Sequence, residues 1–344
     1  MGEGFEPNIV TVLPVLNEEQ HIEACLDALI AQTYPSAKHS VLVMDGGSSD
    51  RTKVLVEDAI QRSAAADGPR IELHHNPGKF VAQGRNRAMS LLHDDVTHVL
   101  ELIGHSTVSP THLEQLSMEW QRISQIEQRP LGALGSRVVP RQGELRTVEC
   151  WIEATLSSPF GSGGGQFDTF TEATPCRIPA FVLHERSALA DVNGWDEAFI
   201  SSQDSDLSMR LSAAGYALWR TPKTQVHMTK RSGLQRWWRM GHRYGFWRTK
   251  TVLKHPARAS LREYLPWFGL MLTVALFALQ HPFAPLPLVA YMFVLSIEGV
   301  RMSLRFQRFS LLIGVPICMM VLHASFSLGL VDGLFRKGGA ASDR

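Results

Sequence analysis

The chain has 344 residues, a formal net charge of +1 and 44% hydrophobic residues. This length suits one large domain plus an appendage, and the balanced charge gives no compositional support for nucleic-acid binding. The hydrophobic residues are unevenly distributed, because residues 1–230 have the composition of a soluble globular protein and residues 263–337 are far more apolar. We therefore expect a globular domain at 1–230, a basic amphipathic interfacial region at 231–262 and a membrane domain at 263–337.

Short apolar, β-branched runs predict strands at 9–15, 40–44, 71–74 and 96–103. Helical spacing predicts helices between them, which begin near Asn17, Arg51 and Val81. This alternation indicates an α/β fold with a mostly parallel sheet. In such a sheet, ligands bind at the carboxyl ends of the strands.

A glycine-rich turn, DGGSSD at 45–50, follows the second predicted strand and precedes a helix. Strand, glycine-rich turn and helix together are typical of a nucleotide site. The spacing fits neither the dinucleotide fingerprint nor the P-loop. A simpler interpretation is that Asp45 and Asp50 only cap the turn.

Further along, we expect helices at 110–128, 149–156 and 186–192, strands at 131–139 and 179–183, and a flexible loop at 158–166. A helical pattern then runs from Asp204 to Gly215. A carboxylate at a helix start could act as a base at a pocket edge. Taken alone, Asp204 is better explained as a simple helix cap.

The C-terminal third begins with ten Lys/Arg and no acid between Lys230 and Arg262, interleaved with aromatic residues. This pattern indicates a face held to anionic headgroups. Three apolar segments follow at 265–280, 283–300 and 309–335. The basic loop at 301–308 predicts that the N-terminal domain faces the cytoplasm. Alternatives are that the third segment dips without crossing, or that these helices form a soluble core.

Several motifs resemble those of family 2 glycosyltransferases, and more narrowly the membrane-attached succinoglycan glucosyltransferase type. They are LPVLNEE at 13–19, VMDGGSSD at 43–50, GKFVAQGRNRA at 78–88, GWDEAF at 194–199 and QDSDLSMRL at 203–211. The resemblance implies a GT-A fold, which is a Rossmann-like sheet with flanking helices. It also implies inverting transfer from a nucleotide sugar.

The resemblance also assigns roles to individual residues. Asp204 would be the catalytic base. Nucleotide-sugar binding would fall to Pro14, Asn17, Glu18, Asp45, Gly46, Lys79, Arg85 and His105. An acceptor wall or lid would include Phe160, Gly161, Gly163, Trp195, Asp196, Gln203 and Arg231.

The sequence departs from the family at Ile103, where the resemblance implies the first aspartate of a DxD metal motif. Isoleucine cannot ligate a metal. His105 could still hold Mn²⁺, or less readily Mg²⁺, with diphosphate oxygens, although Glu101 would lie too deep to help. Alternatively, Lys79, His105 and Arg231 could replace the metal, or transfer activity could be lost.

The expected protein is thus a multi-pass enzyme of the inner, cytoplasmic membrane. It would move a hexose, from UDP-glucose by preference, to a polyprenyl-diphosphate-linked glycan. Its partners would be the nucleotide diphosphate sugar, the lipid-linked acceptor and the membrane, with no nucleic acid. The alternative is a catalytically impaired homologue that acts as a sugar-nucleotide sensor or as a scaffold for polysaccharide assembly.

Overall fold

The computed structural model describes residues 6–162, 167, 170–230 and 233–339. The chain divides into two compact units. Met1–Gln142 and Phe170–Thr229 form a sheet unit, and Gly143–Thr169 and Lys230–Arg344 form a helical unit. The chain therefore leaves the sheet unit after Gln142 and returns to it at Phe170.

The sheet unit is the mostly parallel α/β structure that the alternating sequence pattern predicts. Its strands are β1 (Ile9–Val15), β2 (His39–Asp45), β3 (Arg70–His75), β4 (His98–Glu101), β5 (Ser106–Val108), β6 (Leu131–Pro140), β7 (Thr174–Pro175), β8 (Val182–Glu185) and β9 (Ala217–Met228). The sheet order is β3-β2-β1-β4-β8-β6-β9-β5, with β7 beside β9. Strands β1 to β4 pair in parallel, so their carboxyl ends share one edge.

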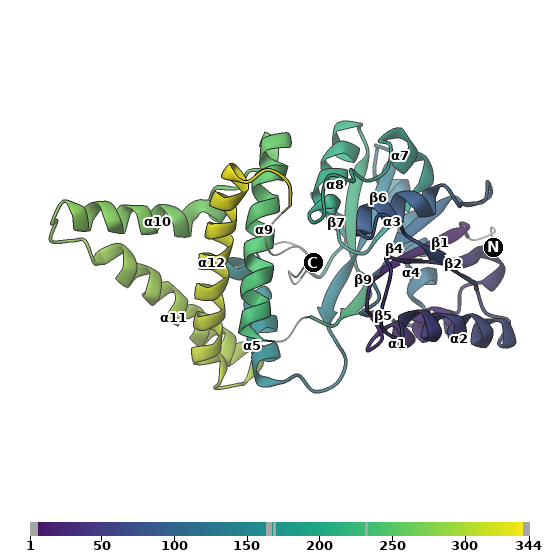
Figure 1. Cartoon of the computed structure of the whole chain (residues 1–344), viewed down its shortest axis with the longest axis horizontal. Helices are drawn as coiled ribbons and strands as arrows, with labels where there is room; N and C mark the ends of the chain where they lie inside the picture. The colour runs from purple at the N-terminus through teal and green to yellow at the C-terminus, as the bar shows by residue number, and fades with distance from the viewer. Residues whose placement is uncertain (1–5, 163–166, 168–169, 231–232, 340–344) are drawn as a thin grey trace. The chain divides into compact units, whose positions relative to one another are not determined.

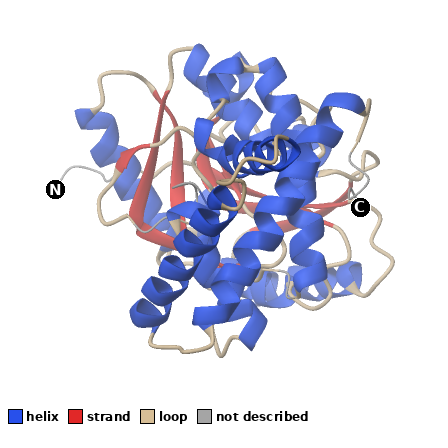
Figure 2. Ribbon diagram, turned by 90° about the vertical axis from the view of Figure 1, so that its left-hand side faces the viewer, coloured by secondary structure: helices blue, strands red, loops and turns tan. Residues whose placement is uncertain are grey.

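Helices cover both faces of this sheet (Figure 2). They are α1 (Ile22–Ile30), α2 (Thr52–Ala65), α3 (Val81–Met89), α4 (His112–Ile126), α7 (Arg186–Asp191) and α8 (Gln203–Ala213). Alternate residues of β1 enter opposite cores: Leu13 packs with residues of α1, α2 and α4, and Val12 with residues of α3, α7 and α8. Burial on both faces explains why β1 reads as a continuous apolar run.

The helical unit contains α5 (Thr147–Leu156), α6 (Pro159–Ser162), α9 (Leu234–Lys254), α10 (Leu261–Ala278), α11 (Leu286–Phe306) and α12 (Leu311–Phe335). The expectation of a loop throughout 158–166 is wrong at its start, because α6 occupies Pro159–Ser162. Ser158 caps this turn, because its side-chain oxygen accepts a hydrogen bond from the Phe160 N–H. Among the described residues, α11 and α12 are long and apolar enough to cross a membrane.

Helices α9 and α12 pack side by side at very short range (Figure 1). Glycines make the close approach possible: a Cβ on Gly245 would lie 2.0 Å from the Phe326 carbonyl oxygen, and one on Gly329 would lie 2.0 Å from that of His242. The Trp237 indole N–H also donates to the Cys318 carbonyl at 2.8 Å. Small residues at such a seam let two helix backbones approach closely.

We predict that Gly245→Ala destabilises the helical unit by about 1–3 kcal/mol, because the new methyl group would overlap the α12 backbone. The measurement is the thermal midpoint of the full chain in detergent. Gly269→Ala is the matched control, since a Cβ there meets nothing within 4 Å. It should leave the midpoint unchanged or raise it slightly. Equal midpoints for both variants would contradict the close α9–α12 seam.

Candidate active site

The loops after β1, β2 and β3 meet at the shared carboxyl edge of the sheet. The Gly46 N–H donates to the Val15 carbonyl at 2.9 Å, and the Asn76 N–H to the Asp45 carbonyl at 2.7 Å. Gly46 must be a glycine at this point, because a Cβ there would lie 2.6 Å from the Lys79 carbonyl oxygen. The sequence motifs that surround Asn17, Asp45 and Lys79 are therefore brought together at this edge.

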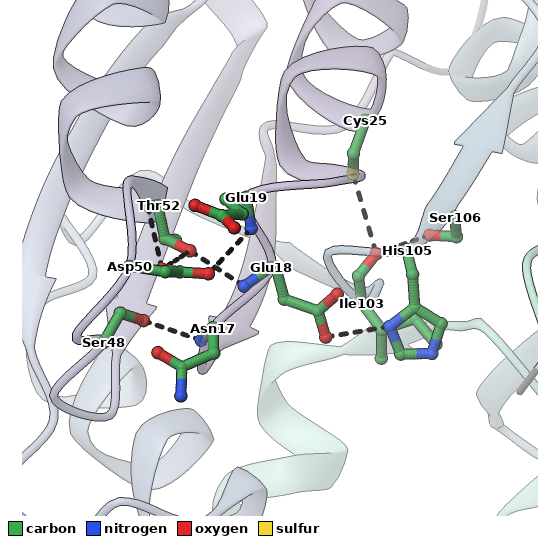
Figure 3. A network of polar contacts seen from close by, with 10 residues as sticks. All are labelled: Asn17, Glu18, Glu19, Cys25, Ser48, Asp50, Thr52, Ile103, His105 and Ser106. Carbon is green, nitrogen blue, oxygen red and sulfur yellow. Dashed lines mark hydrogen bonds and ion pairs between the residues drawn. The ribbon is translucent and has the colours of Figure 1, made fainter.

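Side chains of the β2–α2 loop bind the backbone of the β1–α1 loop (Figure 3). The Asn17 N–H donates to Ser48 Oγ at 2.9 Å, and the Glu18 N–H donates to Thr52 Oγ1 at 2.8 Å. Asn17 adopts a left-handed backbone conformation with φ of 55°, which asparagine tolerates better than most residues. Its Oδ1 in turn accepts the Ser49 N–H at 2.9 Å. These bonds lock the two loops together.

The locked loop carries Glu18 to His105 (Figure 3). Glu18 Oε1 and His105 Nδ1 lie 2.9 Å apart, and both side chains keep some contact with solvent, at 12% and 23% exposure. Gly104 permits the approach, since a Cβ at that position would lie 2.9 Å from Glu18 Cγ. When the carboxylate accepts the Nδ1–H proton, the imidazole Nε2 carries the lone pair.

Ile103 supplies no side-chain ligand, and its carbonyl is already engaged. That oxygen accepts the Ser106 hydroxyl at 2.7 Å and faces the Cys25 thiol at 3.6 Å. Among residues 6–162, 167, 170–230 and 233–339, no three His, Cys, Asp or Glu side chains cluster as a metal site. His21 is a near neighbour of His105, with ring centroids 6.4 Å apart, and burial lowers its pKa below the ordinary value.

The oriented imidazole is nevertheless suited to a metal. A carboxylate that binds one ring nitrogen of a histidine is the usual support for metal ligation by the other nitrogen. Glu18 and His105 have this arrangement. An ion at this position would take His105 as its protein ligand and would need further oxygens from a bound substrate.

The remaining nucleotide-side candidates occupy different environments. Pro14 is buried inside β1, opposite Met44 of β2. Asp45 is buried, and its carboxylate accepts the N–H groups of Gly47 and Ser48 at 3.1 Å each, so it caps its own turn. Lys79 is exposed on the loop beside Gly46, with φ of 69°.

Arg85 lies in a buried polar network. Its guanidinium contacts Glu101 at 2.9 Å, and both side chains are only 6% exposed. His184 Nε2 contacts the other oxygen of Glu101 at 2.8 Å. Burial acts to raise the pKa of Glu101, but Arg85 and His184 outweigh it and hold that pKa below the usual range. Sequence reasoning placed Arg85 beside the nucleotide and did not foresee this network.

Sequence reasoning also missed Asn86, which holds the loop after α7. Its amide accepts the Trp195 N–H at 2.9 Å and donates to the Trp195 carbonyl at 2.8 Å and to Glu197 Oε1 at 2.9 Å. Gly194 makes room, since a Cβ there would lie 2.5 Å from Asn86 Oδ1. The Gly-Trp-Asp motif at 194–196 is the available signal in the sequence, because its glycine predicts a tight loop. The structure agrees, since Gly194 has a positive φ.

The loop held by Asn86 leads to α8, where Asp204 is the second residue. Asp204 is half-buried, and its Oδ1 accepts its neighbour's N–H, that of Ser205, at 2.8 Å. Gln203 precedes it, with a buried Oε1 that has no hydrogen-bond partner among the described residues. Trp195 is buried, and the Asp196 carboxylate accepts the Ala198 N–H at 2.9 Å.

Two expected acceptor-side residues belong to the helical unit. Phe160 is exposed on α6, and its carbonyl lies 3.0 Å from His323 Nε2 of α12. Gly161 packs so closely that a Cβ would lie 2.0 Å from the Thr155 carbonyl oxygen. Gly163 and Arg231 lie outside the described residues.

Comparison with known proteins yields both relatives and a structural neighbour. The Succinoglycan biosynthesis protein ExoA of Rhizobium meliloti is 29% identical over 92% of each chain. A Methanococcus voltae protein, Dolichyl N-acetyl-alpha-D-glucosaminyl phosphate 3-beta-D-2,3-diacetamido-2,3-dideoxy-beta-D-glucuronosyltransferase, is 21% identical over 95% of this chain and 97% of its own. The solved mannosyltransferase PcManGT from Pyrobaculum calidifontis, in complex with GDP-Man and Mn²⁺, aligns with a TM-score of 0.57. The alignment has 17% identity and covers 96% of this chain and 87% of that chain.

The structural neighbour confirms the GT-A fold that the motifs predict. The profile of glycosyl transferase family 2 matches residues 11–192, which is more than half of the chain. This range contains the locked loops, the Glu18–His105 pair and the Asn86 amide. The chain is a glycosyltransferase that belongs to glycosyl transferase family 2.

Proposed function

We propose that this enzyme is a membrane-anchored, inverting hexosyltransferase of cell-surface polysaccharide synthesis. It takes its sugar from a nucleotide diphosphate donor, UDP-glucose by preference, and delivers it to a polyprenyl-diphosphate-linked glycan. The supporting observation is the locked set of loops at one sheet edge, which presents Glu18, His105 and Lys79 where nucleotides bind in α/β folds. The name of one relative, a succinoglycan biosynthesis protein, supports polysaccharide synthesis, and the name of the other, a transferase acting on a dolichyl-linked sugar, supports a lipid-linked acceptor.

In this proposal Asp204 is the general base. It removes the proton of the acceptor hydroxyl as that oxygen attacks the anomeric carbon from the face opposite the diphosphate. The bond from the anomeric carbon to the diphosphate oxygen breaks, and the configuration inverts. Its place at the start of α8 keeps the carboxylate half-exposed, which such a base requires.

The donor side would rest on Lys79, His105 and the loop backbone. Lys79 offers an exposed cation beside Gly46. His105, oriented by Glu18, would bind a divalent ion such as Mn²⁺ together with diphosphate oxygens. When bound, that ion supplies positive charge that stabilises the leaving diphosphate. The Mn²⁺ named in the PcManGT complex is consistent with this choice.

Membrane attachment rests on the helical unit. Two of its helices are long and apolar enough to cross a membrane, and many large apolar side chains of α10 and α11 are exposed. The excess of Lys and Arg around α9 would favour anionic headgroups. An enzyme held at this level reaches a lipid-linked acceptor, and we place it on the cytoplasmic face of the inner membrane.

Asp204→Asn tests the base. We expect kcat for transfer of radiolabelled glucose to lipid extract to fall roughly 100–10,000-fold, because the amide cannot take a proton. The affinity for UDP should not change. Glu57→Gln, an exposed acid on α2, is the control and should keep full activity. Equal transfer by wild type and Asp204→Asn would refute the assigned base.

His105→Ala tests the ion site by binding as well as by activity. Calorimetry should show that Mn²⁺ strengthens UDP binding to wild type at least tenfold and has no such effect on His105→Ala. Glu18→Gln should retain part of the Mn²⁺ effect, since its side-chain oxygen can still accept the Nδ1–H. An unchanged Mn²⁺ effect in His105→Ala would exclude the histidine as a ligand.

Asn86→Ala tests the loop that leads to Asp204. We expect kcat to fall on the order of 100-fold, because misplacing a catalytic group by about 1 Å costs that much. UDP affinity should stay within about twofold of wild type, since Asn86 binds the acceptor-side loop. Arg87→Ala, exposed on the same helix, should behave as wild type. A fall in UDP affinity that matches the fall in kcat would instead indicate general unfolding.

Ile103 supports a second candidate function, a homologue that binds sugar nucleotides without transferring them. Its apolar side chain stands where the family motif carries an acid. Such a protein would act as a sensor or scaffold for polysaccharide assembly. The test uses wild-type protein with Mn²⁺ supplied. If it binds UDP but neither transfers the sugar nor slowly hydrolyses the donor, this second function is favoured over the enzyme.

A further inference from the structure

The helix α12 runs parallel to α9 and is paired with it for most of α9's length. Trp237 bonds to the Cys318 carbonyl at 2.8 Å, Thr249 to the Leu330 carbonyl at 2.9 Å, and Lys250 to the Arg336 carbonyl at 2.8 Å. Both sequences advance in the same direction along these contacts. If residues 318–336 of α12 were inside a membrane, residues 237–250 of α9 would therefore be there too.

Helix α9 is too charged for the interior of a bilayer. The paired stretch 237–250 contains Arg239, Arg243, Arg248 and Lys250. Charged side chains within the hydrocarbon core are costly and rare. The glycine seam leaves no space for lipid between the two helices, because a Cβ on Gly245 or Gly329 already meets backbone at 2.0 Å. The second half of α12 is therefore tied to the depth of α9, whose charges disfavour the hydrocarbon.

The first half of α12 is bound to α5 in the same way. A Cβ on Gly314 would lie 2.2 Å from the Trp151 indole, and Ala154 packs with Leu311 and Val315. Helix α5 has ten residues, which is far short of the roughly 20 needed to span. The chain enters α5 from the sheet unit after Gln142 and returns to that unit at Phe170, so α5 does not carry the chain across a membrane.

Helices α10 and α11 have the opposite character. Residues 264–297 contain no Asp, Glu, Lys or Arg, and α10 has no buried residue. Exposed apolar side chains surround α10 on all sides, including Phe268, Leu270, Met271, Leu272 and Val274. A helix that is apolar all round fits acyl chains, whereas a protein partner would cover one stripe. Figure 1 shows that the two helices extend away from α9 and α12 and meet at a turn, so that they form a helical hairpin.

The uncharged parts of α10 and α11 are short. The apolar part of α10 runs from Tyr264 to Ala278, about 22 Å of helix, and that of α11 from Leu286 to Ile297, about 18 Å. A hydrocarbon core is about 30 Å thick. The exposed Arg262 precedes the apolar part of α10, and the exposed Arg305 and Arg308 follow that of α11, where they suit anionic headgroups.

We infer that the α10–α11 hairpin alone enters the bilayer, as a re-entrant loop, and that α12 lies outside the hydrocarbon core. Lys337, just after α12, then stays on the side of the membrane from which α9 begins. This inference rests on the membrane attachment of the proposed function. It replaces three spans with a single membrane-inserted hairpin, although α12 by itself is long and apolar enough to cross.

The first test maps sidedness in the full-length protein in oriented vesicles. Single cysteines at Glu57, His281 and Lys337 are labelled with a membrane-impermeant maleimide, with wild type as background. We expect Lys337→Cys to react from the same side as Glu57→Cys on the sheet unit, and His281→Cys at the hairpin turn to react from neither side. Labelling of Lys337→Cys from the opposite side would overturn the inference in favour of three spans. Labelling of His281→Cys from the opposite side would show that the hairpin turn crosses the bilayer, which would overturn the re-entrant loop.

The second test compares two exposed apolar residues on the two helices. Met271 on α10 is 46% exposed and Leu328 on α12 is 53% exposed. Met271→Arg should raise several-fold the fraction of the protein that alkaline carbonate releases from membranes. Leu328→Arg should leave that fraction unchanged. Equal release of both variants would contradict the different environments proposed for the helices. Complete release of wild type would refute membrane attachment itself, which is a separate outcome.

Discussion

The site depends on hydrogen bonds that tie the loop after β1 to the loop after β2. Ser48 and Thr52 accept the N–H groups of Asn17 and Glu18, and Asn17 accepts the Ser49 N–H in return. Backbone groups at strand ends lose their ladder partners, so these side chains satisfy donors that would otherwise be left unpaired. Because the backbone is held at both Asn17 and Glu18, the Glu18 side chain has a defined direction, which is toward His105.

The fixed direction of Glu18 bears on position 103, where isoleucine stands in place of the acid of the family motif. With no acid at that position, the negative charge beside His105 comes from Glu18, on a different strand-end loop. Gly104 leaves the space that Glu18 occupies, so Ile103, Gly104 and His105 act with Glu18 as one arrangement. A chain with a degenerate metal motif can still orient an imidazole for an ion through a carboxylate from elsewhere.

The loop that leads to Asp204 depends on a different residue, Asn86, which binds the Trp195 backbone in both directions. Beside it, Arg85 is buried with Glu101 and His184, and this network joins α3 to β4 and β8. A buried ion pair of this kind is costly to break, because either partner alone would be an unpaired charge. Helix α3 therefore links the loop at Lys79 to the loop that precedes Asp204.

The sequence by itself determined the α/β class, the sheet edge where the motifs meet and the apolar character of the tail. These follow from local patterns: β1 is apolar because both of its faces are buried, and Gly46 and Gly194 stand where the backbone approaches other groups closely. Only the tertiary structure decided what lies across space. The Glu18–His105 bond spans 87 positions, the Asn86–Trp195 bonds span 109, and α12 is paired with the charged α9. Hydropathy describes the composition of one segment and not of its neighbour, so by hydropathy alone nothing indicates that the apolar α12 packs against a charged helix.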